Sequence, residues 1–231
     1  MKIYTHLKLV VVSCFIYIFA MSPVYATEAN TKKPLSVYFA GSLFSQKDLI
    51  GNLYLSEAIS KISEHRYKCF MVQNKVQQKV THKIIKDQDL LALIDSDVAL
   101  FAFDGTELDS GTVVEFIAAK FLDKPAVIYR TDFRGGSGEE AIDEHSNKWN
   151  LMVSFYPRTK IVYLNAMVEY QKIYEQYKNE SAHVISQKYS EYIAQHLIDN
   201  MDDVLSESPI LKGKDLLSIQ QNYKKLMGII E

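Results

Sequence analysis

The sequence predicts an α/β fold in which a parallel sheet carries helices on both faces and a helical extension follows. Short apolar runs typical of buried strands alternate with segments whose apolar residues recur at helical spacing. The strand-like runs, such as "VALFAF" at 98–103, are apolar almost throughout, as expected where both faces of a sheet are covered. Beyond residue 166 the pattern is polar and helical, which predicts an extension packed on the same domain.

The individual elements follow from strand-like runs, helical periodicity and capping residues. Ser45 is suited to cap the first helix, because Asp48 three residues later completes a capping box. Asp109 or Ser110 is suited to cap the third helix. A long loop, 131–150, precedes the last strand. The expected order is strand 35–41, helix 45–66, strand 67–72, helix 86–96, strand 98–103, helix 110–122, strand 125–130 and strand 160–165. We therefore predict a flavodoxin-like parallel sheet of about five strands.

The N-terminal segment has the features of a secretory signal peptide. Two lysines lie within the first eight residues, an apolar run of 13 residues follows, and Val24-x-Ala26 provides a small-residue cleavage site. We expect a signal peptide at 1–26 and a secreted or periplasmic mature protein; the alternative is an uncleaved signal anchor. A mobile leader at 27–34, an α/β domain at 35–165 and the helical extension at 166–231 complete the predicted organisation.

Composition excludes several classes of function. Cleavage would remove two lysines and no acid, so the formal charge would change from −2 to −4, which does not favour a polymeric nucleic acid as partner. Cys69 is the one cysteine after residue 26, so we expect no internal disulfide. The six histidines lack metal-ligand spacing, and we predict no metal site and no cofactor. No membrane association is expected once the signal is removed.

Several carboxylates lie around the third predicted strand, where a parallel sheet binds its ligands. Asp109 stands at the start of the following helix, and Glu115 lies about one and a half turns into it among apolar neighbours. Asp89 lies on the preceding helix. These three side chains are therefore predicted to converge on one pocket. The alternatives are that Asp109 only caps the helix and that Glu115 is a surface residue; Asp97 is expected to be a turn residue.

The order and spacing of these residues resemble the nucleoside 2-deoxyribosyltransferase family. The resemblance covers about residues 35 to 165 and rests on five motifs taken together. The motifs are Tyr38-Phe39-Ala40-Gly41-Ser42-Leu43-Phe44, Asp89-Leu90 eight residues before Asp97, Asp104-Gly105, Asp109-Ser110-Gly111-Thr112-Val113-Val114-Glu115, and Lys124-Pro125 with Thr131-Asp132-Phe133-Arg134. Gly41-Ser42 also matches the related deoxynucleoside 5′-monophosphate N-glycosidases. Ile117 replaces a glycine that the family usually has, which is expected to change helix packing.

The resemblance implies a role for each of these residues. Glu115 would be the nucleophile that attacks C1′ of deoxyribose, Asp89 would protonate or hydrogen-bond the departing base, and Tyr38 would hydrogen-bond and orient Glu115. Asp109 would bind sugar hydroxyls or the base. The remaining substrate-binding candidates are Gly41, Ser42, Phe44, Gly111 and Asn150. Family members form homo-oligomers with shared pockets, so Asn150 is a candidate for donation to a neighbouring subunit; the alternative is a turn residue.

We therefore predict an enzyme that cleaves the N-glycosidic bond of a 2′-deoxynucleoside and transfers the sugar to another nucleobase through a deoxyribosyl-glutamate ester. A second carboxylate assists the leaving group in such chemistry. The first alternative is an N-glycosidase of a nucleoside or its 5′-monophosphate, which for the monophosphate would use donors at Ser42 and Ser45. The second is a nucleoside- or nucleotide-binding module without catalysis. Each of the three takes a small nucleoside or nucleobase as its partner.

Overall fold

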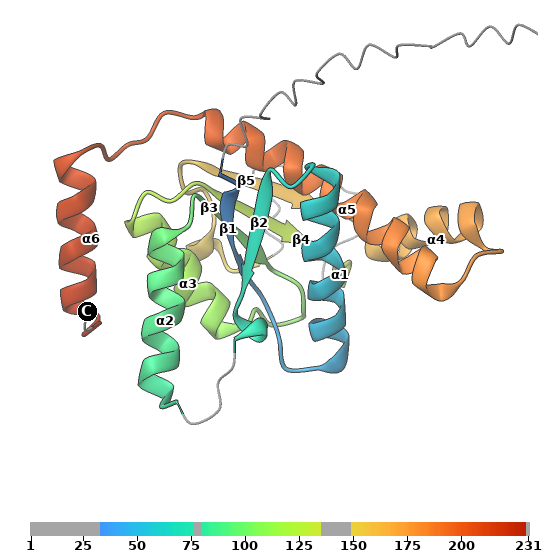
Figure 1. The fold of residues 1–231 in the computed structure, drawn as a ribbon, viewed down its shortest axis with the longest axis horizontal. Coiled ribbons are helices and arrows are strands. Elements are labelled where there is room, and N and C mark those ends of the chain that lie inside the picture. The colour runs from blue at the N-terminus through green and yellow to red at the C-terminus, as the bar shows by residue number, and fades with distance from the viewer. Residues whose placement is uncertain (1–32, 76–79, 135–148, 230–231) are drawn as a thin grey trace, which may run out of the picture. The chain divides into compact units, whose positions relative to one another are not determined.

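Five parallel strands form the sheet in the computed structural model, which describes residues 33–75, 80–134 and 149–229 (Figure 1). The strand order is β2-β1-β3-β4-β5, and every pairing is parallel. The strands are β1 Leu35–Ala40, β2 Tyr67–Met71, β3 Val98–Ala102, β4 Ala126–Arg130 and β5 Thr159–Tyr163. The α/β prediction of a five-stranded parallel sheet is confirmed. The predicted signal peptide at 1–26, the leader up to residue 32 and most of the 131–150 loop lie outside the described residues.

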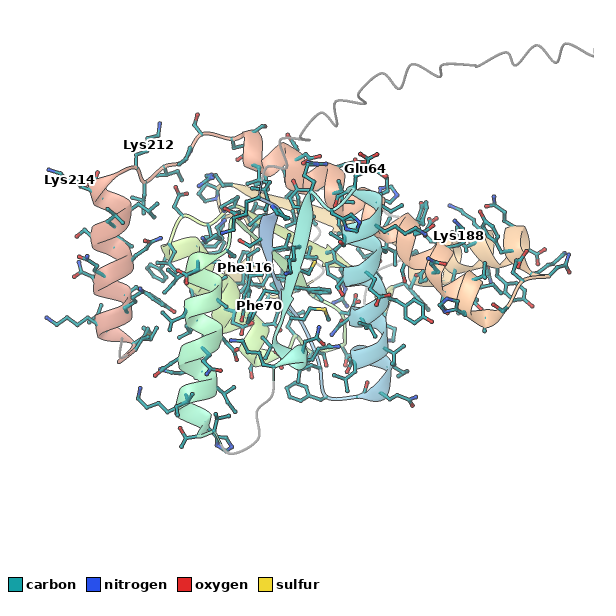
Figure 2. The ribbon with its side chains drawn as sticks, viewed as in Figure 1. Glu64, Phe70, Phe116, Lys188, Lys212 and Lys214 are labelled. Atoms are coloured by element: carbon teal, nitrogen blue, oxygen red, sulfur yellow. The ribbon has the colours of Figure 1, made fainter. Side chains whose placement is uncertain are left out.

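The central strands are buried because helices cover both faces of the sheet. On one face, side chains of β1, β3 and β4 pack against α1 (Gln46–Ile62) and α5 (Ala182–Ser206). On the other face they pack against α2 (His82–Asp95) and α3 (Ser110–Phe121). Phe116 of α3, which Figure 2 labels, illustrates this second layer. Its ring meets those of Phe101 and Phe103 at centroid distances of 5.3 and 5.7 Å. Ile117, the departure from the family pattern, packs against the same cluster.

Local capping fixes where the helices begin. Ser45 Oγ accepts from the Asp48 amide at 3.2 Å while the Asp48 carboxylate accepts from the Ser45 amide at 3.1 Å, so the predicted capping box is present. Asp109 caps α3 as expected. Helix α2 begins four residues before the predicted 86, because Thr81 Oγ1 accepts from the Ile84 amide and provides an earlier cap. Helix α1 ends at Ile62, before the predicted 66, because the chain turns through positive φ at 64 and 65.

The helical extension consists of α4 (Ala166–Tyr177), α5 and α6 (Lys214–Leu226). Helix α5 buries Leu197 and Met201 against the sheet and α1. Helix α6 belongs to the other face, where Ile219 and Tyr223 pack against the cluster that contains α2 and α3. In the described ranges, none of the helices has the length and apolarity needed to cross a bilayer.

Candidate active site

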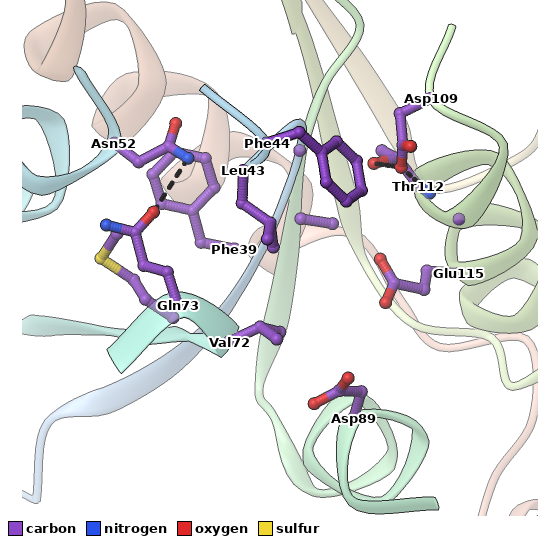
Figure 3. A pocket seen from close by; sticks show the side chains of 14 residues that line it. Phe39, Leu43, Phe44, Asn52, Val72, Gln73, Asp89, Asp109, Thr112 and Glu115 are labelled. Carbon is purple, nitrogen blue, oxygen red and sulfur yellow. Dashed lines mark hydrogen bonds between the residues drawn. The ribbon is translucent and has the colours of Figure 1, made fainter. Parts of the chain in front are cut away.

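A cavity of about 150 Å³ opens where β1 and β2 end, beside the start of α3, and it brings three carboxylates together (Figure 3). Because β1 pairs with β3, the loop after β1 lies beside the start of α3. Asp109 and Glu115 reach the cavity from α3, and Asp89 reaches it from α2. The convergence predicted from the sequence is therefore present in the structure.

Glu115 is held by Tyr38, whose phenol Oη donates a hydrogen bond to Glu115 Oε1 at 2.7 Å. Tyr38 lies on β1, is fully buried and stacks on Phe70 at a centroid distance of 6.0 Å, so its position is fixed by the sheet. Burial raises the pKa of Glu115 to about 7; the charges of Asp89 and Asp109 also raise it, and the Tyr38 hydrogen bond opposes them. Burial also raises the pKa of Tyr38 well above its ordinary value, so the phenol remains a neutral donor.

Asp89 is suited to carry a proton. Its Oδ1 is buried and has no hydrogen-bond partner among the described residues. Burial raises the pKa of Asp89, while the charge of Lys75 opposes the rise. A buried carboxyl oxygen without a partner favours the protonated form and leaves a donor available for a ligand in the cavity.

Asp109 caps α3 and lines the cavity at the same time. One oxygen, Oδ2, accepts from the Thr112 amide at 2.7 Å and from Thr112 Oγ1 at 2.8 Å. These bonds leave Oδ1 uncommitted to the cap. A Cβ at Gly111 would lie 3.2 Å from Asp109 Oδ2, so a glycine here leaves room for the carboxylate. Asp109 therefore caps the helix and lines the pocket at once, so the two predicted positions are compatible.

The other candidates divide between the cavity and its surroundings. Gly41 lines the cavity, and a Cβ on it would lie 2.8 Å from the Cβ of Ala102, so the ends of β1 and β3 require glycine there. Phe44 stands at the cavity with 78% of its surface exposed, available to stack on a planar ligand. Ser42 does not line the cavity, because its Oγ donates to Asp48 Oδ2 at 2.9 Å.

Asn150 lies apart from this cavity in its own chain. Its Oδ1 accepts from the Met152 amide at 3.0 Å and caps the short 3-10 helix Leu151–Val153. It lines a separate hollow beside Trp149. Within one chain Asn150 is therefore a capping residue, and its donation to a neighbouring subunit stays a prediction.

Sequence reasoning missed two amide side chains that line the cavity, Asn52 of α1 and Gln73 just after β2. Asn52 Nδ2 donates to Ser42 O at 3.0 Å and to Gln73 Oε1 at 3.1 Å, as Figure 3 shows for the second bond. Gln73 Nε2 donates to Leu49 O at 2.9 Å. The rule that ligands bind beyond strand ends could have identified Gln73, because β2 ends two residues before it.

A second, larger cavity of about 500 Å³ adjoins the first. The two cavities share Asp89, Gly111 and Glu115, but less of the surface that lines the second cavity is polar. Apolar and aromatic side chains line much of it, namely Ile85, Leu90, Val114, Tyr223 and Met227, together with the polar residues His82, Lys86 and Ser110. Glu115 and Asp89 thus stand at the border between the two cavities.

The remaining acids of the region serve the fold. Asp97 Oδ2 accepts from the Ser36 amide and from Ser36 Oγ, both at 2.7 Å, which ties β3 to β1. Asp104 accepts from the amides of Thr131 and Asp132 and so joins the ends of β3 and β4. Over the part of the chain that the structure describes, no group of His, Cys, Asp or Glu is arranged to hold a metal ion.

Comparisons with known proteins give a family and several distant structures. A conserved protein from Enterococcus faecalis V583 is 22% identical, with 74% of this chain and 99% of that chain covered and a TM-score of 0.45. A 2-deoxyribosyltransferase from Bacillus psychrosaccharolyticus is 15% identical, with coverage of 65% and 95% and a TM-score of 0.42. A CMP N-glycosidase from Clostridium botulinum is 14% identical, with coverage of 62% and 98% and a TM-score of 0.39. The comparison with curated proteins found no match.

The family match includes the four candidate residues around Glu115. A family model described as "Nucleoside 2-deoxyribosyltransferase" matches residues 37–152, a span that holds Tyr38, Asp89, Asp109 and Glu115. The match extends over half of the chain and includes the Tyr38–Glu115 hydrogen bond on which the site is built. The chain therefore belongs to the nucleoside 2-deoxyribosyltransferase family.

Proposed function

We propose that the protein transfers the deoxyribose of a 2′-deoxynucleoside to another nucleobase through an ester on Glu115. Family membership makes the chain an enzyme, a pentosyltransferase or N-glycosidase acting on nucleosides or nucleotides. The observation that carries the finer proposal is the placement of Glu115. It is hydrogen-bonded by Tyr38 at 2.7 Å and shares its cavity with Asp89, whose buried oxygen has no partner among the described residues.

In the first step, an oxygen of Glu115 attacks C1′ of the bound deoxynucleoside. The C1′–N bond breaks, its electron pair remains on the base nitrogen, and Asp89 donates the proton that neutralises the departing base. The transition state resembles an oxocarbenium ion, whose positive charge the surrounding carboxylates stabilise. The Tyr38 hydrogen bond keeps Glu115 in position for this attack, and Asp109 retains a free oxygen for a sugar hydroxyl.

In the second step, a nitrogen of the incoming base attacks C1′ of the ester. The C1′–O bond breaks, its electron pair returns to the Glu115 carboxylate, and the proton of the base N–H passes to Asp89. Both carboxyl groups then regain their starting forms. Water attacking in place of the base would release free deoxyribose, with the same proton transfer to Asp89.

The lining of the first cavity favours a nucleoside over a nucleoside 5′-monophosphate. None of the fourteen described residues that line the cavity is Lys or Arg. The serine donors expected to bind a phosphate are engaged, because Ser42 Oγ and the Ser45 amide both donate to the Asp48 carboxylate. These bonds lower the pKa of Asp48, although burial opposes them, so the group is a carboxylate at neutral pH. A phosphate dianion beside it would be repelled.

The test is to incubate the protein with deoxyinosine, with and without adenine, and to follow bases and nucleosides by chromatography. Deoxyadenosine in the tube with adenine is the expected result. Equal release of hypoxanthine in both tubes, without deoxyadenosine, would show an N-glycosidase instead. No turnover would support a nucleoside-binding module. A parallel tube with deoxyinosine 5′-monophosphate tests the phosphate argument, and faster turnover there would contradict it.

A further inference from the structure

We propose that helix α6 closes the active site within one chain and that Tyr223 on this helix protects the Glu115 ester from water. The inference rests on the proposed function, because it concerns the fate of that ester. Helix α6 lies outside residues 37–152, the span matched by the family model, so this wall of the site belongs to the chain's own C-terminal extension.

Two lysines of α2 hold the end of α6. Lys83 Nζ donates to Gly228 O and Lys86 Nζ donates to Met227 O, each at 2.9 Å. The ammonium groups thereby satisfy carbonyls that have no partner at a helix C-terminus, where positive charge is also favoured. Figure 1 shows α6 running beside α2, and the buried side chain of Ile229 continues the contact past the last turn.

The segment that leads into α6 is fixed as well. Asp123 Oδ2 accepts from the backbone amides of Ile210 and Leu211 at 2.7 and 2.8 Å. The same carboxylate is paired with Arg158 at 3.0 Å, and the side chains of both are over 90% buried. A buried and paired carboxylate is a costly group to disturb. Helix α6 is therefore anchored at both of its ends.

This anchoring places two side chains of α6 over the reactive carboxylates. Tyr223 and Met227 are four residues apart, so they lie on one face of the helix. Both line the apolar cavity of about 500 Å³ that also contains Glu115 and Asp89. Burial raises the pKa of Tyr223, and the charge of Glu115 raises it further, in agreement with their proximity.

The wall matters because a base and water compete for the same ester. Each attacks C1′, returns the C1′–O electron pair to Glu115 and passes a proton to Asp89. The second cavity borders Glu115 and opens to solvent, and the Tyr223 ring on its wall would narrow the path by which water reaches a bound sugar. Removing the ring would open a path for water while leaving Glu115, Asp89 and Tyr38 in place.

The experiment compares Tyr223→Ala, Tyr223→Phe and Leu226→Ala with the unaltered full chain, measuring deoxyadenosine and free deoxyribose made from deoxyinosine plus adenine. Leu226 is the matched control, because it lies on α6 with 81% of its surface exposed and does not line the cavity. Tyr223→Ala should raise the ratio of hydrolysis to transfer roughly tenfold. Tyr223→Phe, which keeps the ring, and Leu226→Ala should leave the ratio within about twofold of the unaltered protein.

An unchanged ratio in Tyr223→Ala, or an equal rise in Leu226→Ala, would overturn the inference and leave the proposed transfer reaction intact. If the unaltered protein only hydrolyses, the proposed transferase function fails; Tyr223→Ala must then still hydrolyse faster, and an unchanged rate overturns the inference. If the unaltered protein turns over no nucleoside, both fail. Thermal melting of each variant shows that a changed ratio comes from folded protein.

Discussion

The environment of Glu115 favours reactivity over stability. Its carboxylate is withdrawn from water and lies near Asp89 and Asp109, and these effects together raise its pKa to about 7. Among the described residues, Tyr38 supplies the one hydrogen bond that favours the ionised form, at 2.7 Å. A carboxylate with a pKa close to neutral is weakly solvated and still ionises, which suits a nucleophile. Burying such a group lowers the stability of the fold.

Glu115→Gln should abolish turnover and stabilise the fold at alkaline pH. The folded-state pKa, about 7, lies above the ordinary value of 4.5, so this group supports folding below pH 4.5 and loses that contribution as the pH rises through 7. A neutral glutamine still accepts the Tyr38 bond and avoids the cost of ionisation, roughly 2–3 kcal/mol at pH 8. Thermal melting at pH 4 and pH 8 checks this, and a variant no more stable than the unaltered protein at pH 8 would contradict it.

The same substitution tests the nucleophile by activity. Loss of a covalent nucleophile should cost several orders of magnitude in rate. A Glu115→Gln or Glu115→Ala protein that retained a tenth of the original rate would remove Glu115 from this role.

Asp89→Asn should change the shape of the pH profile of kcat/KM. In the proposed mechanism the active form has a proton on Asp89 and none on Glu115, which predicts a bell-shaped profile. An asparagine does not titrate, so the alkaline limb should disappear. The rate should fall by about 10²–10⁴ for a poorly leaving base and less for a good one. Equal losses for both bases would exclude Asp89 as the acid.

At the scale of elements, the site depends on how closely β1 and β3 approach one another at their carboxyl ends. Ala40 pairs with Phe101, and the chain then passes Ala102 at Gly41 without space for a side chain. This approach brings the loop after β1, with Phe44, to the start of α3, where Asp109 caps the helix.

Gly41→Ala should therefore lower both stability and activity. The new Cβ would lie 2.8 Å from the Cβ of Ala102, and the overpacking should cost about 1–3 kcal/mol. Gly51→Ala is the matched control, because its Cβ would meet nothing within 4 Å in the interior of α1. That change should stabilise the protein by roughly 0.5–1 kcal/mol. Urea unfolding of both variants measures the difference, and equal midpoints would refute the close-approach argument.

At the scale of the whole molecule, export and assembly are proposals that arise from the ends of the chain and from the family resemblance. The predicted signal peptide at 1–26 lies outside the described residues, so the proposal of an exported mature protein depends on the charged start, the apolar run and the Val24-x-Ala26 site. A homo-oligomer that shares Asn150 between subunits is the corresponding proposal for assembly.

N-terminal sequencing of the exported protein should give Thr27 as its first residue. A protein that still starts at Met1 would replace the cleaved signal with an anchor. Light scattering on the active protein addresses assembly, where a monomer with full activity would exclude a pocket shared between subunits. That second outcome would agree with a site closed in cis by α6.

Features set by short-range interactions were determined by the sequence alone. The Ser45–Asp48 capping box and the Asp109 cap each join residues three apart, so the local sequence pattern predicted both. The five parallel strands followed from apolar runs alternating with helical periodicity. The convergence of Asp89, Asp109 and Glu115 followed from the rule that parallel sheets bind ligands beyond their strand ends.

Only the tertiary structure decided which distant segments complete the site. Lys83 and Gly228 are 145 residues apart, and Asp123 and Ile210 are 87 apart, yet these pairs position α6 over Glu115. The helical pattern of the extension predicts an apolar face on each helix but not the surface against which that face packs. That choice depends on the packing of helices far apart in the chain. No local sequence pattern therefore predicted that Tyr223 lines the cavity beside Glu115.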